Sequence, residues 1–399
     1  MLKNKCKFYF WSLAALGEGI SGGDRIFMEL ARHWSKKQSV VIHVWEEGYR
    51  MCLKQGLQKY PIKFEISKME KWARYGFVVN YFARIIEGIL LGMTKKLDNK
   101  PTTFVYSSSE FWMDCLPAFL LKLRYPRIIW LASWYQTAPN PLKGFSQGKR
   151  EKTYKAKAFL YWLSQQPIKP LISKFADFVF VNNDEEKKQF PEHAKQRRAI
   201  VVLGAVDLKA IKNWSLKNGR LPKVYDAVFQ GRFHPQKGVL ELIDIWKMVV
   251  EKKPEARLAM IGDGPLRKDV ELLISNYQLE DNVTLFGYVF DGHKKYKIFS
   301  QSKIVVHPAF YDSGGMAAAE AMAFGLPCVG FDLKAYSSYY PKGMLKAKYG
   351  NLRDFAQKIL KLLENEKIRK KIGKEALEMI EKNWSWEKRA SEVLDKIGQ

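Results

Sequence analysis

The chain has 399 residues, 47% of them hydrophobic and 14% aromatic, which predicts two or three domains with large buried cores. Its formal net charge of +26 predicts an anionic partner. No apolar run approaches the roughly 20 residues of a membrane span, and four scattered cysteines without C-x-x-C spacing argue against a zinc site or a disulfide framework. We therefore expect a soluble protein in the reducing cytoplasm.

The N-terminal apolar run, residues 8–15, predicts a buried first strand rather than a secretory signal, because it leads directly into a glycine turn. Gly17, Gly19 and Gly22 form G-x-G-x-x-G between this strand and the next helix. Glu46 follows near the end of the next apolar run, so the spacing matches a dinucleotide-binding fingerprint. The motif does not identify the ligand, because any backbone that approaches a phosphate or sugar closely needs glycine.

The first half of the chain predicts a parallel sheet with helices on both faces, because apolar runs alternate with segments of helical periodicity. Strands are predicted at 6–13, 40–45, 62–66, 103–107, 127–132, 177–182 and 199–203, and helices at about 23–37, 70–97, 111–123 and 150–175. Within this half, Lys122–Lys174 contains 11 basic residues and one acidic residue, interleaved with nine aromatic residues. Such a surface suits an anionic partner, and a solvated face of a lysine-rich protein is the alternative.

The alternation restarts after a polar stretch, residues 207–223, which is predicted to link a first domain, 1–206, to a second, 224–382. A C-terminal helix over 383–399 is predicted to return to the first domain. In the second domain, strands are predicted at 224–230, 257–261, 283–286, 303–306 and 327–331, and helices at 237–252, 265–277, 291–300 and 315–323. We expect two doubly wound α/β domains that face each other across a cleft.

Two cations stand where a helix begins in the second domain. Arg232 follows a strand and Lys237 lies at the mouth of the next helix, so both reach an anion at that helix N-terminus. Arginine offers a planar fork and lysine a compact point charge, a pair that suits a diphosphate. By itself the stretch fits a surface turn with two solvated cations equally well. The six histidines are scattered and are expected to be structural, except that His234 lies between the two cations.

Two carboxylates flank a glycine turn further along the chain. Asp312 precedes Gly314 and Gly315, where a helix is predicted to begin. Glu320 lies inside that helix, and a helical rise over eight residues is about 12 Å, more than the roughly 5–9.5 Å of a glycosidase pair. This spacing suits the two ends of a long ligand such as a nucleotide sugar. A capping aspartate and a solvated helix glutamate are the alternative for this segment alone.

The order of four motifs, G-R-x(4)-K-G (Gly231–Gly238), IGDGP (Ile261–Pro265), VTLFGYV (Val283–Val289) and an acidic-x7-Glu stretch ending EAMAFGLP, resembles the retaining glycosyltransferases of family 4. These enzymes adopt the GT-B fold. The first half is similar more loosely, through GISGGDRIFMELARHW, ADFVFVNNDEEKKQF and VVLGAVD, so the resemblance covers nearly the entire chain. It implies a retaining hexosyltransferase that uses a nucleotide-diphosphate sugar as co-substrate.

The resemblance also implies a role for individual residues. Arg232 and Lys237 hold the diphosphate, Asp312 contacts the transferred sugar, and Glu320 binds the ribose hydroxyls. Backbone groups complete the donor site, and they belong to Gly22 and Gly23 at the phosphates, Tyr288 and Val289 at the base, and Ser313, Gly314, Gly315 and Met316 at the sugar.

This chain departs from the family pattern in two places. Asp312 stands where the family usually has glutamate, and Ser133, Trp134 and Tyr135 stand where many relatives carry a histidine near the reacting centre. We therefore assign no catalytic base, since the leaving diphosphate can take the acceptor proton while cations stabilise its charge. The chain contains no D-x-D triplet to bind a divalent ion, so we predict no metal and no cofactor.

Two other functions are compatible with parts of the sequence. A nucleotide-sugar epimerase of the same fold needs an acid and a base at the sugar, and the sequence shows no such pair. An RNA-binding protein accounts for the basic and aromatic stretch but leaves the spacing from Arg232 to Glu320 unexplained. We therefore expect a glycan or lipid-linked sugar as acceptor, and no nucleic acid as partner.

The segment Lys68–Leu97 is apolar and aromatic on much of the circumference of a predicted helix, with cations on the rest. Such a helix either buries its apolar face in the first domain or lies in a membrane interface. Together with Lys122–Lys174 it predicts a basic, aromatic face that binds an anionic leaflet. A cytoplasmic enzyme held peripherally at the inner face of the membrane is the resulting expectation.

Overall fold

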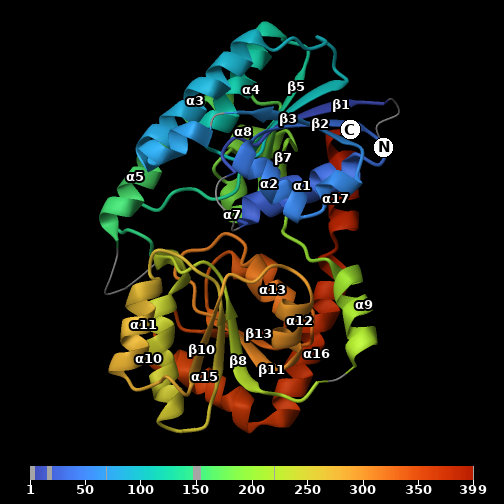
Figure 1. Ribbon diagram of the computed structural model, residues 1–399. Coiled ribbons are helices and arrows are strands. Elements are labelled where there is room, and N and C mark those ends of the chain that lie inside the picture. The colour runs from blue at the N-terminus through green and yellow to red at the C-terminus, as the bar shows by residue number, and fades with distance from the viewer. Residues whose placement is uncertain (1–4, 16–19, 69, 147–153, 220, 399) are drawn as a thin grey trace. The chain divides into compact units, whose positions relative to one another are not determined.

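The computed structural model describes residues 5–15, 20–68, 70–146, 154–219 and 221–398. Contacts between residues divide the chain into two compact units. The first holds Met1–Ala138, Leu160–Gly204 and Trp386–Gln399, and the second holds Pro139–Phe159 and Ala205–Ser385. Each unit is built on one parallel sheet with helices on both of its faces (Figure 1).

The first unit contains a seven-stranded sheet in the order β3-β2-β1-β4-β5-β6-β7. Its strands are β1 (Lys7–Trp11), β2 (Ser39–Trp45), β3 (Ile62–Ser67), β4 (Thr103–Ser107), β5 (Ile129–Trp134), β6 (Phe178–Val181) and β7 (Ala199–Val201). Each of the strands predicted in this half from an apolar run is present. The order runs outward in both directions from β1, as in a doubly wound sheet.

The first half of the chain and its C-terminus supply the helices around this sheet. They are α1 (Gly22–Trp34), α2 (Glu46–Lys54), η1 (Leu57–Lys59), η2 (Glu70–Tyr75), α3 (Phe77–Thr94), α4 (Trp112–Arg124), α5 (Lys155–Gln165), α6 (Ile168–Phe175), α7 (Asp184–Lys187), α8 (Pro191–Lys195) and α17 (Trp386–Ile397). Figure 1 shows α3 and α4 over one face of the sheet and α1 and α17 over the other.

Strand β1 shows why the sheet is covered on both faces. Its residues are buried from Phe8 onward, and alternate side chains point to opposite faces. Phe8 contacts Trp34 of α1, with ring centroids 4.9 Å apart, whereas Trp11 belongs to the core beneath α3 and α4. The Trp34 indole donates a hydrogen bond of 2.9 Å to the carbonyl of Ala390, which ties α17 to α1.

Two predicted long helices are each divided in the structure. The segment 70–97 forms η2 and α3, which are separated by Gly76 at φ +90°, a conformation that side-chain-bearing residues rarely adopt. The segment 150–175 contains α5 and α6, and the break falls at Pro167, which lacks the N–H that would continue the helical hydrogen bonds. Helix α2 was not predicted, because its segment is short and polar.

The second unit contains a six-stranded sheet in the order β10-β9-β8-β11-β12-β13. Its strands are β8 (Tyr225–Gln230), β9 (Leu258–Ile261), β10 (Val283–Gly287), β11 (Ser302–His307), β12 (Cys328–Phe331) and β13 (Met344–Ala347). Its helices are α9 (Leu208–Asn218), η3 (Pro235–Lys237), α10 (Val239–Val250), α11 (Arg267–Asn276), α12 (His293–Ser300), α13 (Met316–Met322), α14 (Tyr336–Tyr339), α15 (Leu352–Glu364) and α16 (Glu366–Asn383). Strand β13 and helix α14 were not predicted.

The observed units differ from the predicted domain boundaries in two segments. The stretch 207–223, predicted as a linker, contains α9, whose N-terminus is capped by the side chain of Asp207. The segment Pro139–Phe159 belongs to the second unit, where Phe145 packs edge-on against His234 at 5.3 Å. The basic stretch Lys122–Lys174 is therefore divided between the units, and part of it, residues 147–153, lies outside the described residues.

Two glycines in the motifs of the second unit are required by close backbone contacts. A Cβ atom on Gly238, at φ +64°, would lie 2.0 Å from the carbonyl oxygen of Pro308. A Cβ atom on Gly262, at φ +144°, would lie 1.9 Å from the carbonyl oxygen of Gly231. Only glycine fits at either position, so these residues hold the loops after β8, β9 and β11 against one another.

Candidate functional site

The predicted donor-site residues of the second unit gather at the carboxyl end of its parallel sheet. Strand β8 ends at Gln230, β10 at Gly287 and β11 at His307, and each is followed by a loop that carries predicted site residues. Ligands of doubly wound sheets bind outside this edge, because the connecting loops there are free to approach a ligand.

A buried cluster surrounds Asp312, whose residue is 8% exposed. Its Oδ2 accepts hydrogen bonds from Lys237 Nζ at 2.8 Å, His307 Nε2 at 2.9 Å and Tyr336 OH at 3.2 Å. Its Oδ1 accepts one from the backbone N–H of Gly314 at 3.2 Å. We call Asp312, Lys237, His307 and Tyr336 the Asp312 cluster. It joins residues from the loops after β8 and β11 with one from α14.

The Asp312 cluster holds an ionised carboxylate next to an ammonium group. Burial alone would favour the neutral acid, but Lys237 and His307 outweigh it and hold the pKa of Asp312 well below its usual range. Burial lowers the pKa of His307. Its Nε2 is the donor of the hydrogen bond to Asp312, since an ionised carboxylate only accepts. The surroundings therefore fix both the charge and the orientation of the carboxylate.

A second cluster surrounds Glu320 on α13. Its Oε2 accepts hydrogen bonds from Gln230 Nε2 at 2.8 Å and from Lys295 Nζ at 2.5 Å. Lys295 also donates to Asp291 Oδ1 at 2.5 Å, and its side chain is 3% exposed. We call Glu320, Gln230, Lys295 and Asp291 the Glu320 cluster. It links α13 to the end of β8 and to α12, so the Glu320 carboxylate is held from two sides.

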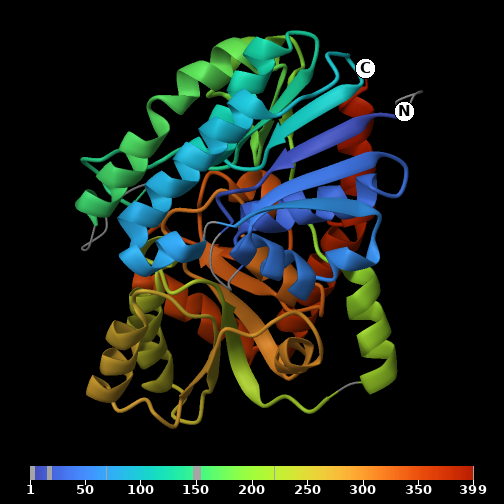
Figure 2. The same cartoon turned by 45° about the horizontal axis from the view of Figure 1, so that its top comes forward.

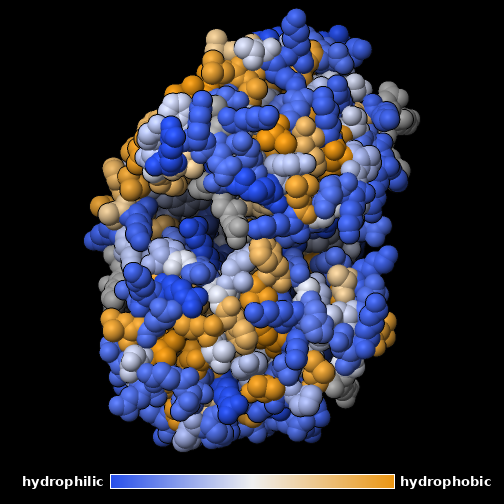
Figure 3. Space-filling model, viewed as in Figure 1, coloured by the Kyte–Doolittle hydropathy of each residue, from blue (hydrophilic) through white to orange (hydrophobic). Residues whose placement is uncertain are grey.

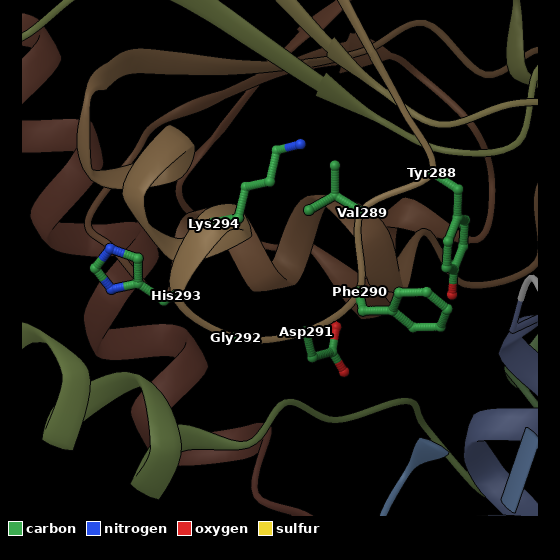
Figure 4. A pocket seen from close by; sticks show the side chains of 7 residues that line it. All are labelled: Tyr288, Val289, Phe290, Asp291, Gly292, His293 and Lys294. Atoms are coloured by element: carbon green, nitrogen blue, oxygen red, sulfur yellow. The ribbon is translucent and has the colours of Figure 1, made fainter.

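A hollow of about 370 Å³ lies in the loop between β10 and α12 (Figure 4). It is lined by Tyr288 and the six residues that follow it, through Lys294. The rings of Tyr288 and Phe290 meet edge to face with centroids 4.8 Å apart, and Val289 between them is buried. Since Asp291 lines this hollow and also contacts Lys295, the hollow borders the Glu320 cluster.

The other predicted site residues are placed as follows. Arg232 is exposed, and over the described ranges its guanidinium forms no hydrogen bond or ion pair. Gly315 caps α13 at φ +58°, and Met316 begins that helix. Ser313 and Gly314 precede them, next to Asp312. A Cβ atom on Gly314 would lie 2.8 Å from Tyr339 OH.

Gly22 and Gly23 belong to the first unit and form the first turn of α1. The helix begins with a capping box, in which the Ser21 and Asp24 side chains each accept a hydrogen bond from the other residue's backbone N–H. Of the fingerprint glycines, Gly17 and Gly19 lie outside the described residues. Glu46 accepts a hydrogen bond from the backbone N–H of Glu70, so its carboxylate is engaged within the first unit.

Ser133, Trp134 and Tyr135, which stand where many relatives carry a histidine, are all buried. The hydroxyls of Tyr135 and Tyr106 lie 2.6 Å apart, and Ser133 donates to Tyr106 at 3.0 Å. Burial raises the pKa of Tyr135 well above its ordinary value. Its hydroxyl therefore stays protonated at neutral pH. No group of three or more His, Cys, Asp and Glu side chains that could hold a metal ion occurs in the described part of the chain.

Five residues of the two clusters were not predicted from the sequence, and they are His307, Tyr336, Gln230, Lys295 and Asp291. His307 was expected to be structural, and it is buried, but it also hydrogen-bonds the Asp312 carboxylate. Its position at the end of a buried strand was a usable signal, because that end forms the ligand edge. Gln230 ends β8 in the same way. Lys295 and Tyr336 gave no such signal, since they come from helices whose packing the sequence does not reveal.

The alternative interpretation of the two carboxylates is wrong. Asp312 is not a solvated helix cap but a buried ion-pair partner, and Glu320 is not a solvated helix residue, since a buried lysine and an amide both donate to it. A carboxylate removed from water requires such partners, because an unpaired buried charge lowers the free energy of unfolding by roughly several kcal/mol.

Comparison with known proteins shows that this chain is similar to glycosyltransferases. The family described as "Glycosyl transferases group 1" matches residues 210–379. An uncharacterised glycosyltransferase of Methanocaldococcus jannaschii is 31% identical over 204 residues, which cover 51% of this chain and 54% of that protein. The poly(ribitol-phosphate) alpha-N-acetylglucosaminyltransferase of Staphylococcus aureus is 31% identical over 160 residues, which cover 39% of this chain and 32% of that enzyme. The chain thus spans about half or less of the length of these relatives.

Solved structures confirm the fold over the full chain. A Staphylococcus aureus TarM structure with fondaparinux, alpha-GlcNAc-glycerol and UDP has a TM-score of 0.73 at 13% identity, covering 99% of this chain and 100% of that one. An Anabaena HepE structure with UDP and glucose has a TM-score of 0.71 at 12% identity, with the same coverage. These similarities confirm the GT-B fold that the motifs implied.

Proposed function

We propose that this chain is a group 1 glycosyltransferase and that it moves a hexose, with retention, from a nucleotide-diphosphate sugar to a glycan or lipid-linked acceptor at the inner face of a membrane. The observation that carries the proposal is the pair of ionised clusters at one edge of the second sheet. One is centred on Asp312 and the other on Glu320. A hollow with two aromatic rings borders the second cluster.

The Glu320 cluster suits the nucleoside end of the donor. Lys295 and Gln230 both donate to Oε2 of Glu320 and so orient the carboxylate, whose two oxygens have about four lone-pair sites with which to accept from ribose hydroxyls. The hollow at Tyr288 and Val289 borders this cluster. Its backbone groups can hydrogen-bond the edge of a planar base, and its aromatic ring can pack against the face of that base. This arrangement supports the roles that the family resemblance gave these residues.

The Asp312 cluster suits the sugar end. Three side chains donate to Oδ2, whereas Oδ1 receives one backbone N–H, so Oδ1 is the oxygen with capacity for a sugar hydroxyl. Backbone N–H groups of the loop 313–316 lie next to it. Lys237 has three donor protons, so it can hold Asp312 and contact a phosphate oxygen at the same time.

The reaction breaks the bond between the anomeric carbon and the phosphate oxygen and forms a bond from the same carbon to the acceptor oxygen, on the same face. Negative charge then grows on the leaving diphosphate. Arg232 and Lys237 stabilise that charge, and the diphosphate takes the proton of the acceptor hydroxyl. No side-chain base is needed in this scheme, and the cations of the protein take the place of a metal ion.

A panel of nucleotide sugars measured by thermal shift tests the proposal. A bound donor raises the melting temperature by mass action, and the largest shift identifies the base and sugar. Transfer to glycan and lipid-linked acceptors is then measured with that donor. Conversion of the donor sugar without any acceptor would establish an epimerase instead. No shift with any nucleotide sugar would contradict the proposal.

Replacing Glu320 by Ala is expected to raise the Kd for the donor about 10- to 150-fold, because the ribose loses a charged hydrogen-bond partner worth about 1.5–3 kcal/mol. Isothermal titration calorimetry measures the change. Glu280→Ala, at an exposed glutamate of the same unit, is the matched control and should bind as the unaltered protein does. Equal affinity of the two variants would show that Glu320 does not contact the nucleotide.

Replacing Lys295 by Met is expected to weaken donor binding about tenfold, because Glu320 loses the ammonium that orients it without itself being removed. Lys295 is thus a positioning residue. Lys297→Met changes an exposed lysine on the same helix and is the control. In the Glu320→Ala protein, the added change Lys295→Met should weaken donor binding little further. If the two losses of affinity were additive, Lys295 would contact the donor itself.

Transfer is expected to continue at an unchanged rate in excess chelator, because Arg232 and Lys237 supply the positive charge at the diphosphate. The assay follows product formation before and after treatment with EDTA. Activity that disappears with chelator and returns with Mn²⁺ or Mg²⁺ would overturn this scheme.

A further inference from the structure

Helix α3 (Phe77–Thr94) packs into the first unit through its smallest residues. Gly88 and Gly92 both face α4 closely. A Cβ atom on Gly88 would lie 2.8 Å from the Met113 carbonyl oxygen, and one on Gly92 would lie 2.8 Å from the Cα of Pro117. No larger residue fits at these two positions. The face of α3 that contains the glycines, which carry no side chain, is therefore the face that packs against α4. The buried side of α3 also contains polar residues.

The polar residue that α3 buries most deeply is Arg84. Its Nη1 donates to the carbonyls of Leu13 at 2.8 Å and Ala15 at 3.1 Å, and its Nη2 lies 3.1 Å from Glu47 Oε2. The guanidinium is 4.0 Å from the Trp45 ring centroid. A surface helix of a globular protein normally exposes its charges. Helix α3 departs from this rule at Arg84, which is buried next to the apolar residues Ala83 and Ile85.

Several large apolar side chains of α3 point outward, whereas Ile85 is buried. Five of them recur at intervals of three or four residues, which places them along one face, and they range from 51% exposed for Leu90 to 65% for Val78. We call this set the α3 stripe, and it consists of Val78, Phe82, Ile86, Leu90 and Met93.

Further apolar side chains extend the α3 stripe. Phe77 and Tyr75 are 69% and 54% exposed at its start. Figure 1 shows α3 at the outer edge of the first unit, and Figure 2 shows the same helix from a second direction. Figure 3 shows hydrophobic side chains along this edge of the first unit. Contiguous exposed apolar surface of this extent marks an interaction site.

Cations flank the α3 stripe at both ends. Lys68, Lys71 and Arg74 precede it and Lys96 follows it, all four exposed. None of the four forms an ion pair with a carboxylate among the residues that the structure describes. The aromatic rings of Trp72 and Tyr75 lie beside the first group, and amphipathic rings of this kind favour the boundary between lipid and water.

We propose that the α3 stripe docks in the headgroup region of an anionic lipid bilayer, with α3 lying along the membrane surface. The stripe supplies apolar contact with the acyl chains, and the flanking cations contact the lipid phosphates. The inference deepens the proposed function by naming the surface that brings the first unit to a lipid-linked acceptor.

Two other occupants fit the observations less well. Within the described residues α3 is the one helix long and apolar enough, by length and composition, to cross a membrane. Crossing would pull Arg84 away from the carbonyls that it holds and expose it to lipid, whereas lying flat keeps its partners. A second copy of the chain would bring the same unpaired cations against one another across a symmetric interface.

Sedimentation of the full-length chain with vesicles tests the proposal. We expect binding to phosphatidylcholine mixed with phosphatidylglycerol, much weaker binding to phosphatidylcholine alone, and a decline as salt is raised. The triple variant Phe82→Ser, Ile86→Ser, Leu90→Ser should lose roughly tenfold or more in partition coefficient, since three apolar side chains no longer enter the bilayer. The variant Lys71→Glu, Arg74→Glu should lose binding to the anionic vesicles.

Leu216→Ser, Leu272→Ser is the matched control, because these two leucines are 84% and 60% exposed in the second unit. It should bind vesicles as the unaltered chain does. Equal vesicle binding by the triple variant, or no binding to anionic vesicles at low salt, would overturn the proposal. Light scattering that shows a dimer lost in the triple variant would assign the stripe to a second copy.

Vesicle binding and nucleotide-sugar binding can be tested independently of each other. Thermal shift by the nucleotide sugar is measured on the same variants, and the α3 stripe lies outside the donor site. Donor binding with no vesicle binding would overturn the docking surface and the membrane location, and it would leave the proposed transfer reaction standing. Vesicle binding with no response to any nucleotide sugar would overturn the proposed transferase alone.

Discussion

Replacing Arg232 by Met is expected to lower kcat by about 10²–10³ and to leave the melting temperature unchanged. The guanidinium is exposed and, within the described ranges, has no protein partner, so its removal breaks no contact of the free protein. Its charge acts on the leaving diphosphate, where negative charge grows in the transition state. An interaction that forms mainly in the transition state changes kcat more than ground-state binding.

Steady-state kinetics test this expectation by comparing the kcat of Arg232→Met with that of Lys268→Met. The second variant removes an exposed cation elsewhere in the same unit. The control should keep its kcat, since it lies on α11. A normal kcat for Arg232→Met, or a fall confined to KM, would remove this residue from the leaving-group site.

The Asp312–Lys237 pair is expected to stabilise the second unit as well as to serve the reaction. Asp312→Asn and Lys237→Met should each lower its free energy of unfolding by about 3–5 kcal/mol, because each leaves a buried partner without its counter-charge. The double variant should lose less than the sum of the two, since it removes both charges. Hydrogen exchange of the second unit measures these losses separately from the first unit.

The pH dependence of this pair has a defined sign. Since the pKa of Asp312 is held well below its usual range, its contribution is fully present above the ordinary carboxyl pKa of about 3.9 and is lost as the pH falls further, through the folded-state pKa. The coupling free energy between Asp312 and Lys237 is the difference between the double variant and the sum of the single variants. It should be constant from neutral pH to about pH 5 and shrink only in stronger acid. Strictly additive losses at neutral pH would show that the two residues do not interact in solution.

Much of the fold followed from local patterns in the sequence. Apolar runs such as Phe8–Trp11 and Leu258–Ile261 alternate with amphipathic segments, and this alternation depends only on residues close together in the chain. The loops at the carboxyl ends of the strands could also be predicted, because a parallel sheet brings those ends to one edge. The resemblance to family 4 glycosyltransferases assigned Arg232, Lys237, Asp312 and Glu320 to one donor site before any contact was known.

The partners of these residues could not be predicted in the same way. Asp312 meets Lys237 across 75 positions of sequence and Tyr336 across 24, and Glu320 meets Lys295 across 25. Each contact depends on how a helix packs against the sheet, to which many distant residues contribute. Local periodicity contains no information about that packing.

Helix α3 shows the same division most clearly. Its composition specified a long apolar segment with cations nearby, and it left open whether the apolar face is buried in the first unit or turned toward a membrane. The answer depends on the fit of Gly88 and Gly92 against α4, where only hydrogen fits in place of a side chain. Because close packing selects the glycine face for the interior, Phe82, Ile86 and Leu90 are left outside, and only the assembled unit reveals that surface.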